Sequence, residues 1–363
     1  MTIPSNTLLP LFQMHQAEYE QKALDVLRSG FYVLGKEVEA FEREFAAYCG
    51  VAHCTSVGTG LDAIRIALHL LGVGEGDEVI VQGNTFIAGV MAITAAGASP
   101  VFAEPDAHFA LSADELEKRL SPHTKAVLVT HLYGMMTPMD PIVAFCERHG
   151  LLLVEDCAQS HGAEYKGKRA GSFGNAGCFS FYPTKNLGCF GDGGAIVTND
   201  ASLDEKIRVF RNYGSEKKYY NSVVGTNSRL DELQAGLLRV RLAHMDELNE
   251  EKNRIARRYS DGIRNAKLIL PVPQPDTYNV WHQYVVRCEE RDALAAYLKE
   301  NGVGTMIHYP VPPHLSGAYS VLGLVPGSLP VTEKYARTVL SLPSYVGLTE
   351  EELDCIIGLL NRF

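Results

Sequence analysis

A carboxylate that follows an apolar run is the first residue in this sequence whose position suggests chemistry. The run ends at Val154 and is followed at once by Glu155 and Asp156. In an open α/β sheet the carboxyl ends of the strands face the ligand crevice, so Asp156 could meet a ligand there. Taken alone, the plainer interpretation is that Asp156 caps the next helix. As a functional group, its carboxylate would keep a cationic ring nitrogen protonated.

A lysine follows in a loop flanked by glycines and aromatic residues. Residues 180–188 read Ser-Phe-Tyr-Pro-Thr-Lys-Asn-Leu-Gly, and Gly-Asp-Gly-Gly follows at 191–194. Most lysines are solvated surface residues, but these neighbours favour partial burial of Lys185, which would lower its pKa and make it a Schiff-base nucleophile. A strand-end Asp and a loop Lys match what pyridoxal phosphate (PLP) requires, because the lysine carries the aldehyde and the aspartate protonates the ring.

A turn that could bind the phosphate lies earlier, at residues 57–63, which read Val-Gly-Thr-Gly-Leu-Asp-Ala. The turn follows a predicted strand and opens a predicted helix, so free backbone N–H groups and the helix dipole would face an anion. The same residues fit the dinucleotide pattern G-x-G-x-x-A. That match is weak, because Asp77 and Glu78 begin the next strand, whereas the confirming acidic residue should end it. A strand–helix turn that simply needs glycine is a fair competitor.

Three further places carry side chains that could bind a ligand. Phe86 follows a strand and could stack on a flat cofactor, although a Phe there is more often core. The basic and aromatic residues at 217–220 and 227–229 could hold a diphosphate, although such a loop is usually a solvated turn. His308 and His314 could suggest a metal, but no acidic residue is near them in sequence, and we expect no metal site.

The first half of the chain alternates helical periodicity with short β-rich runs, which favours βαβ units around a parallel sheet. The runs 127–129 and 151–154 are apolar on both faces, as expected for strands covered by helices on each side. The pattern predicts helices at 18–28, 37–48, 61–71, 88–96, 113–120 and 141–148, and strands at 52–57, 78–81, 99–103, 126–130 and 151–154.

The second half predicts a smaller lobe. A long charged helix, with a break near His244, ends before three spaced prolines that cannot be helical. We place the domain boundary on this helix, which gives a large domain at 1–250 and a small C-terminal domain at 251–363. The elements predicted here are helices at 203–213, 230–264, 291–301 and 350–360, a strand at 282–287, and a Pro/Gly-rich stretch at 310–330.

Composition narrows the class of protein. The chain has 363 residues, of which 46% are apolar and 21% charged, so wholesale disorder is excluded. A net charge of −10 argues against a nucleic-acid partner. No apolar run is long enough to cross a bilayer, and no signal peptide is visible, so we expect a soluble cytoplasmic protein with no membrane partner. The eight cysteines form no CxxC pair and are expected to be free thiols, most of them buried.

Together these motifs resemble the DegT/StrS family of PLP-dependent nucleotide-sugar aminotransferases, over essentially the whole chain. The resemblance implies an α/β fold of the PLP-dependent fold type I (aspartate aminotransferase-like). Such a fold has a large, doubly wound, mostly parallel sheet domain and a small C-terminal α+β domain. The matching segments are 30–35, 60–63, 155–163, 179–194, 227–235 and 308–310.

The resemblance also implies a role for each matching position. Lys185 would form the Schiff base with PLP and then move the proton between sugar and cofactor carbons. Asp156 would pair with the ring nitrogen, while Asn227 of a second subunit would help to bind the phosphate, so a homodimer would share its active sites. The implied cofactor contacts are Gly60, Leu61, Phe86, Asp156, Gln159, Ser180, Lys185 and Asn227. Two departures are notable: many members have Asn-Gly-Thr where residues 59–61 read Thr-Gly-Leu, and many have an aromatic residue at Thr226.

The stretches at 182–188, 191–194 and 308–310 resemble most closely the subgroup that aminates dTDP-linked 3-keto-6-deoxyhexoses, with glutamate as amino donor. The expected substrate contacts are Tyr182, Lys218, Tyr219, Arg229, His308 and Tyr309. Alternatives are a 4-keto (C4) nucleotide-sugar aminotransferase and a UDP-linked 3-keto sugar aminotransferase. More distant ones are an NAD-dependent sugar oxidoreductase, which gives Lys185 and Asp156 no shared task, and a non-catalytic regulatory relative, which would be expected to have lost one of them.

Overall fold

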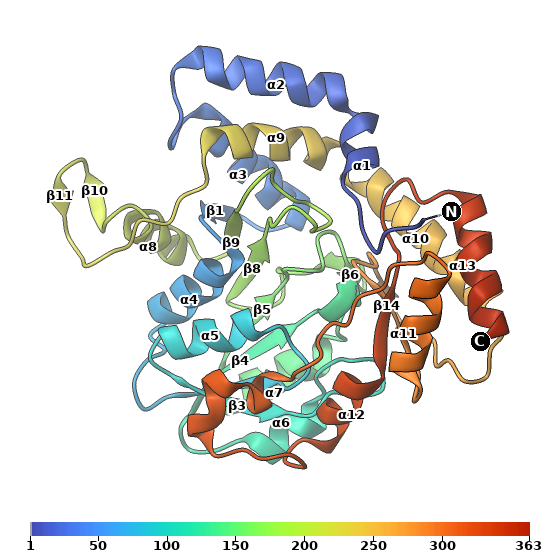
Figure 1. The fold of residues 1–363 in the computed structure, drawn as a ribbon. Helices are drawn as coiled ribbons and strands as arrows, with labels where there is room; N and C mark the ends of the chain where they lie inside the picture. The colour runs from blue at the N-terminus through green and yellow to red at the C-terminus, as the bar shows by residue number, and fades with distance from the viewer. Residues whose placement is uncertain (1) are drawn as a thin grey trace.

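The computed structural model describes residues 2–363, and a seven-stranded sheet with helices on both faces forms its centre (Figure 1). The strand order is β1-β9-β8-β5-β4-β2-β3. Within this sheet β9 alone runs against the other strands, so the sheet is mostly parallel, as predicted. The strands of the sheet are β1 (His53–Val57), β2 (Glu78–Gln82), β3 (Ser99–Ala103), β4 (Thr124–Thr130), β5 (Leu152–Asp156), β8 (Ala176–Ser180) and β9 (Gly194–Thr198).

Alternating side chains of each strand enter two separate cores, one on each face of the sheet. In β4, Ala126 and Leu128 pack under α4, α5 and α8, whereas Val127 and Val129 pack under α3, α7 and α9. Burial on both faces explains why these strands are apolar throughout rather than alternating. The helices are α1 (Leu9–Met14), α2 (Gln16–Ser29), α3 (Lys36–Cys49), α4 (Gly60–Leu70), α5 (Ile87–Ala95), α6 (Ala113–Arg119), α7 (Asp140–His149), α8 (Ala201–Phe210) and α9 (Glu232–Ala243).

A third core belongs to the C-terminal lobe, where β13 pairs antiparallel with β14. Ile3 from the start of the chain is buried in this core and forms a backbone bridge to Val303. Both termini lie beside this lobe in Figure 1. The division at residue 250 falls within α10 and stays a prediction. The lobe's elements are α10 (Met245–Gly262), β13 (Tyr284–Arg287), α11 (Arg291–Glu300), α12 (Pro330–Thr338), β14 (Val339–Leu342) and α13 (Glu350–Arg362).

Small strands and loops surround the central sheet and the C-terminal lobe. The hairpin of β10 (Ser215–Lys217) and β11 (Tyr220–Asn221) projects from the body of the molecule in Figure 1. A second small sheet joins β6 (Glu164–Tyr165), β7 (Lys168–Arg169) and β12 (Thr277–Tyr278). Short 3-10 turns occupy Leu132–Gly134, Pro313–Leu315 and Gly317–Leu322.

Most of the predicted helices and strands are confirmed to within about two residues, including the break in the long charged helix. His244 has non-helical backbone angles and separates α9 from α10. The predicted helix at 203–213 is too long, because α8 ends at Phe210 and the chain turns into the hairpin. Strands β8 and β9 were not predicted. No helix within residues 2–363 has both the length and the apolar character needed to span a bilayer.

Candidate active site

The two carboxylates at the end of β5 point to different environments. Glu155 is fully buried and accepts hydrogen bonds from the backbone N–H groups of Gly171 (2.9 Å), Phe173 (2.8 Å) and Gly174 (2.9 Å), so it holds a loop in place. Asp156 is 6% exposed, and its Oδ1 accepts from the N–H of Ala158 at 3.1 Å. No helix follows directly, so Asp156 is not a helix cap.

Burial raises the pKa of Asp156, while the nearby charge of Lys185 acts in the opposite direction. A carboxylate in such a place is ionised most readily when a cation lies against it. The Oδ2 atom lies 3.5 Å from the Thr130 hydroxyl and would lie 3.7 Å from a Cβ at Gly89, at the start of α5. Asp156 therefore faces the space between the ends of β4 and β5 and the N-terminal turn of α5.

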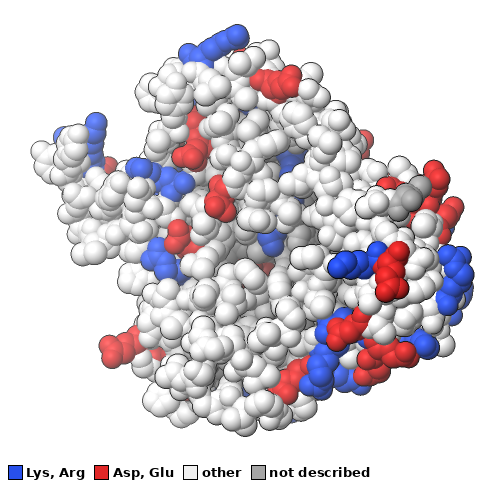
Figure 2. Space-filling model, in the orientation of Figure 1, with Lys and Arg blue, Asp and Glu red and all other residues white. Residues whose placement is uncertain are grey.

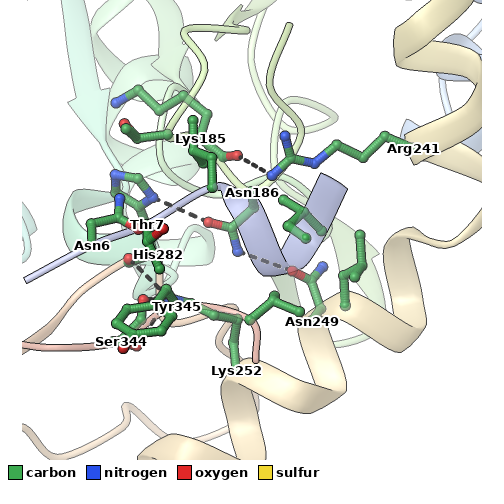
Figure 3. Close-up of a pocket in the computed structure, with 15 residues that line it drawn as sticks. Asn6, Thr7, Lys185, Asn186, Arg241, Asn249, Lys252, His282, Ser344 and Tyr345 are labelled. Atoms are coloured by element: carbon green, nitrogen blue, oxygen red, sulfur yellow. Dashed lines mark hydrogen bonds between the residues drawn. The ribbon is translucent and has the colours of Figure 1, made fainter. Parts of the chain in front are cut away.

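Lys185 lies in the loop that connects β8 to β9, as the glycine-rich sequence predicted. Burial lowers its pKa to about 8, against the opposing effect of Asp156. The loop is held from behind, because Arg241 on α9 donates to the carbonyl oxygens of Lys185 and Gly188, each at 3.1 Å. Figure 3 shows this contact and the side chain of Asn186 beside it.

The neighbouring Asn186 fastens the loop to the rest of the chain. Its amide nitrogen donates to Asn249 Oδ1 at 3.0 Å and to the carbonyl of Val280 at 2.8 Å, and its oxygen lies 3.2 Å from His282 Nδ1. These contacts come from α10 and from the segment that enters the C-terminal lobe. The backbone that carries Lys185 is therefore fixed by both lobes, which makes the direction of its side chain well defined.

The glycine turn before α4 lies directly against the end of β8. A Cβ added at Gly60 would come within 2.5 Å of Ser180 Cβ, so only glycine allows this approach. The approach places the Ser180 hydroxyl beside the N-terminus of α4, where the N–H groups of Gly60 and Leu61 have no intrahelical acceptor. These groups and the helix dipole form an anion-binding end of the site.

Aromatic and amide side chains form the opposite wall. Phe86 is 48% exposed at the N-terminus of α5, and its ring centroid lies 5.1 Å from that of Tyr309. Gln159 is buried, accepts from the N–H of Tyr133 at 2.6 Å, and donates to the Tyr309 hydroxyl at 3.1 Å. The structure thus brings Phe86, Gln159 and Tyr309 together although they are distant in sequence.

Two of the predicted substrate residues line one polar cleft of about 310 Å³ next to the lysine loop. Tyr182 is exposed and His308 is half-buried, with its Nδ1 atom 2.8 Å from the Ser341 hydroxyl. Burial and the charge of Lys185 lower the pKa of His308 to about 4, so its ring is neutral at physiological pH. Figure 2 shows this face hollowed at its centre, with the densest group of charged side chains over the C-terminal lobe.

The remaining predicted residues are not part of this cleft. Lys218 and Tyr219 occupy the tip of the β10–β11 hairpin, where Tyr219 is 85% exposed. Arg229 is held at the base of the hairpin by Asn212, whose side-chain oxygen lies 2.9 Å from Arg229 Nη1. Asn227 is exposed, and within residues 2–363 its side chain forms no hydrogen bond. None of these four residues lines the cleft, although Asn227 and Arg229 flank Ser228, which bonds to the glycine turn of the same chain.

Several residues that shape the site could not be singled out in the sequence. Ser228, next to Asn227, accepts from the N–H of Gly58 at 2.9 Å and donates to Asp62 at 2.7 Å, so it fixes the glycine turn of its own chain. Arg241 is one of several charged residues on α9. No pattern in the neighbouring sequence marks either Ser228 or Arg241, because each bonds to groups far away in the sequence.

One family of known proteins matches almost the whole chain. The sequence model of the DegT/DnrJ/EryC1/StrS aminotransferase family matches residues 13–361. The chain belongs to this family. The fold described above is that of an aminotransferase of PLP-dependent fold type I, which confirms the family and the fold that the resemblance implied.

Individual members of the DegT/DnrJ/EryC1/StrS family are similar over their full length. A dTDP-3-amino-3,4,6-trideoxy-alpha-D-glucose transaminase from Streptomyces venezuelae is 49% identical over 94% of this chain and 90% of its own. A dTDP-3-amino-3,6-dideoxy-alpha-D-galactopyranose transaminase from Aneurinibacillus thermoaerophilus is 46% identical over 99% of both. The crystal structure of DesV from S. venezuelae in complex with a ketimine intermediate superposes with a TM-score of 0.98 at 47% identity, covering 99% of this chain and 98% of DesV.

Proposed function

We propose that this aminotransferase moves an amino group from glutamate to carbon 3 of a dTDP-linked 3-keto-6-deoxyhexose, with pyridoxal phosphate bound at Lys185 and Asp156. The pairing of these two residues is the main support for this function. A loop lysine whose pKa is lowered to about 8 and a buried strand-end carboxylate influence one another across the same space. An aminotransferase needs a carrier for the amino group, and this pair suits PLP.

The chain provides a partner for each part of that cofactor. The Ser180 hydroxyl and the N–H groups of Gly60 and Leu61 would bind the phosphate, since a Cβ at Gly60 would fill the space beside Ser180. Phe86 would cover the ring face. Gln159 would donate a hydrogen bond to the ring hydroxyl. To do so, its amide must either turn away from the Tyr309 hydroxyl or bond to both groups.

Pyridoxal phosphate supplies an aldehyde that accepts the amino group and a ring that takes up the electron pair of the adjacent carbon. The chain's own groups control the protons. Asp156 would hold a proton on the ring nitrogen, because a cation against it lowers the cost of its buried negative charge. Lys185 would take and return the proton at the reacting carbons, a task that suits an amine with a pKa of about 8.

The substrate assignment rests on the relatives and on the cleft. Two relatives that are 46% and 49% identical are named as transaminases of dTDP-linked 3-amino sugars. The cleft beside Lys185 presents hydroxyl, amide and neutral imidazole groups, which suit the hydroxyls of a pyranose. We expect Tyr182, His308 and Tyr309 to contact the sugar.

We further propose a homodimer whose subunits share their active sites. Lys218, Tyr219, Arg229 and Asn227 do not line the cleft beside Lys185 in their own chain, and the nearby surface exposes Tyr220, Val223 and Val224. A hairpin of this kind fits a position over the neighbouring subunit, where its lysine and arginine could meet the diphosphate and Asn227 the cofactor phosphate. We also propose that the enzyme is cytoplasmic.

The experiment is transfer of ¹⁵N from labelled glutamate to a panel of dTDP- and UDP-linked 3-keto and 4-keto 6-deoxyhexoses, followed by mass spectrometry and NMR of the product. The proposal expects ¹⁵N at carbon 3 of the dTDP-linked 3-keto sugar, with clearly higher kcat/KM than for the other three. Preference for a 4-keto or UDP-linked sugar would overturn the substrate assignment but keep the aminotransferase. Turnover that needs NADH and no added PLP would contradict the assignment of PLP as the cofactor.

A further inference from the structure

Behind the backbone of Lys185 lies a small pocket that is lined by two buried cations. It is bounded by the lysine loop, by α9 and α10, and by residues 6–11 of the N-terminal segment (Figure 3). Arg241 on α9 and Lys252 on α10 both face it, and each is only 7% exposed. The pocket adjoins the polar cleft, with which it shares several lining residues, but the two cations line this pocket and not the cleft.

Neither cation is neutralised by a carboxylate. Within residues 2–363 no Asp or Glu lines the pocket, and neither Arg241 nor Lys252 takes part in an ion pair. This sets them apart from Arg239, two residues earlier on the same helix, whose guanidinium reaches Glu37 at 2.6 Å and Glu44 at 2.8 Å. Buried charges without a counter-charge are costly, so a pair of them in one pocket calls for an explanation.

The hydrogen-bonding state of the two side chains points to a missing acceptor. Lys252 donates to the carbonyl of His282, and to the carbonyl and hydroxyl of Ser344. Arg241 donates to two loop carbonyls through its Nη atoms, but its buried Nε–H has no acceptor among residues 2–363. Burial and mutual repulsion act on the pair, lowering the pKa of Lys252 to about 7. Both features are what an absent anion would correct.

The size of the pocket limits the ligand. Its volume of about 40 Å³ exceeds the space that one water needs, about 10–15 Å³, but is far too small for a sugar or a nucleotide. Apart from the two cations, the lining includes the Thr7 hydroxyl and the Asn6 amide, each of which can donate a hydrogen bond. A monatomic anion fits both the size and the two cations.

We propose that this pocket binds a small monovalent inorganic anion of the halide class, held by the Nε–H of Arg241 and the charge of Lys252. The anion would stabilise the contact between α9 and the carbonyl of Lys185, because it offsets the cost of burying the charge of Arg241. This binding does not depend on the sugar or the amino donor. It is therefore tested independently of the proposed function.

The test is thermal unfolding of the purified holoprotein in increasing bromide, with isethionate replacing bromide to keep the ionic strength constant. We expect a saturable rise in Tm of about 2–4 °C, the shift that follows when an anion binds the folded state alone at concentrations well above its Kd. Arg241→Gln should abolish the bromide-dependent rise. Arg239→Gln, a control on the same helix, should keep it, because Arg239 already has its counter-charges. An equal rise in the wild type and in Arg241→Gln, or none in the wild type, would overturn the proposal.

A crystal experiment keeps the proposal testable if Arg241→Gln does not fold. Wild-type crystals soaked in bromide should give an anomalous density peak within hydrogen-bonding distance of Arg241 Nε. Density in the pocket that carries no anomalous signal would show that only water occupies it, and the proposal would then be wrong.

Discussion

The lysine loop and the β10–β11 hairpin are both polar loops near the site, but their surroundings differ completely. The lysine loop is held by Arg241 and Asn186, whose partners come from both lobes of the same chain. The hairpin projects from the body, and Tyr219 at its tip is 85% exposed. In the proposed dimer, the residues around Lys185 would come mostly from one chain, whereas the contacts to the diphosphate would come from the hairpin of the second chain.

This difference has a physical reason. A group that makes and breaks bonds must be held to within a fraction of an ångström, and rigid elements with interlocking hydrogen bonds provide that precision. A diphosphate is a large, multiply charged target, which basic side chains on an exposed loop can bind without such precision.

Replacing Lys185 should have the largest effect. Lys185→Ala should lower the rate of amino transfer by about 10³-fold or more, because one change removes both the covalent carrier and the proton shuttle. Single-turnover assays with glutamate measure the loss. The control Lys206→Ala removes an exposed lysine of α8 and should have wild-type activity. Full turnover by Lys185→Ala would refute the role assigned to the loop.

The two adjacent carboxylates of β5 should separate chemistry from stability. Asp156→Asn should fold normally but lose about 10²- to 10³-fold in kcat, the usual cost of removing one electrostatic partner of the reacting group. Glu155→Gln should instead lower the free energy of unfolding by about 2 kcal/mol, because a charged acceptor of three N–H bonds is lost. When kcat and urea unfolding are measured for both variants, Asp156→Asn should lose mainly activity and Glu155→Gln mainly stability. Equal losses in the two variants would contradict this distinction.

A hybrid dimer can show which chain completes the hairpin end of the site. Asn227→Ala should cost about tenfold in activity, through the loss of one hydrogen bond to a charged group. A purified hybrid of one Lys185→Ala chain and one Asn227→Ala chain should keep about half of the wild-type activity if Asn227 acts across the interface, since one of its sites is then intact. If Asn227 acts within its own chain, that hybrid should keep only about a twentieth.

The glycine turn should control cofactor affinity rather than chemistry. Gly60→Ala would force a Cβ to within 2.5 Å of Ser180 and push the turn away from the phosphate. We expect the Kd for PLP to rise about tenfold or more, in line with overpacking costs of 1–3 kcal/mol. Gly317→Ala, at a position with open space, is the matched control and should bind PLP normally. Equal Kd values for the two variants would argue against this phosphate site.

The last prediction concerns the pH dependence of PLP capture. The free amine of Lys185 attacks the cofactor aldehyde, and its pKa is lowered to about 8. The rate at which the apoprotein captures PLP should therefore rise about tenfold per pH unit below pH 8 and level off above it. Stopped-flow absorbance from pH 6 to pH 10 measures this profile. A rise that continues to pH 10 would show that the lysine has the pKa of an exposed amine.

Local patterns in the sequence were enough to predict the frame and to single out Asp156 and Lys185 as candidates. Strands β2 to β5 are short apolar runs with helices between them, and Asp156 and Lys185 stand beside such elements in recognisable motifs. Strands β8 and β9 are as short as β2 and β3 but were missed, because each contains a glycine, Gly177 or Gly194, which weakens the strand pattern. Their pairing, which creates the lysine loop, depends on contacts across the sheet.

Supporting residues could not be predicted for the same reason. Ser228 bonds to Gly58, 170 positions away, and Arg241 bonds to Lys185, 56 positions away. A sequence window around either residue carries no sign of its partner. The hairpin is the opposite case. Its basic and aromatic residues were recognised in the sequence, but only the structure shows that they project away from the cleft beside Lys185 of their own chain.

The visible absorption spectrum of the holoprotein can show whether Lys185 and Asp156 together form the proposed amino-transfer centre. We expect a yellow band that glutamate bleaches and that a dTDP-linked 3-keto-6-deoxyhexose restores. In Lys185→Ala the band should be absent, and in Asp156→Asn the bleaching should be slowed at least a hundredfold, about the cost of a lost electrostatic partner. A wild-type protein that shows no band after PLP is supplied, or a band that glutamate leaves unchanged, would contradict the claim.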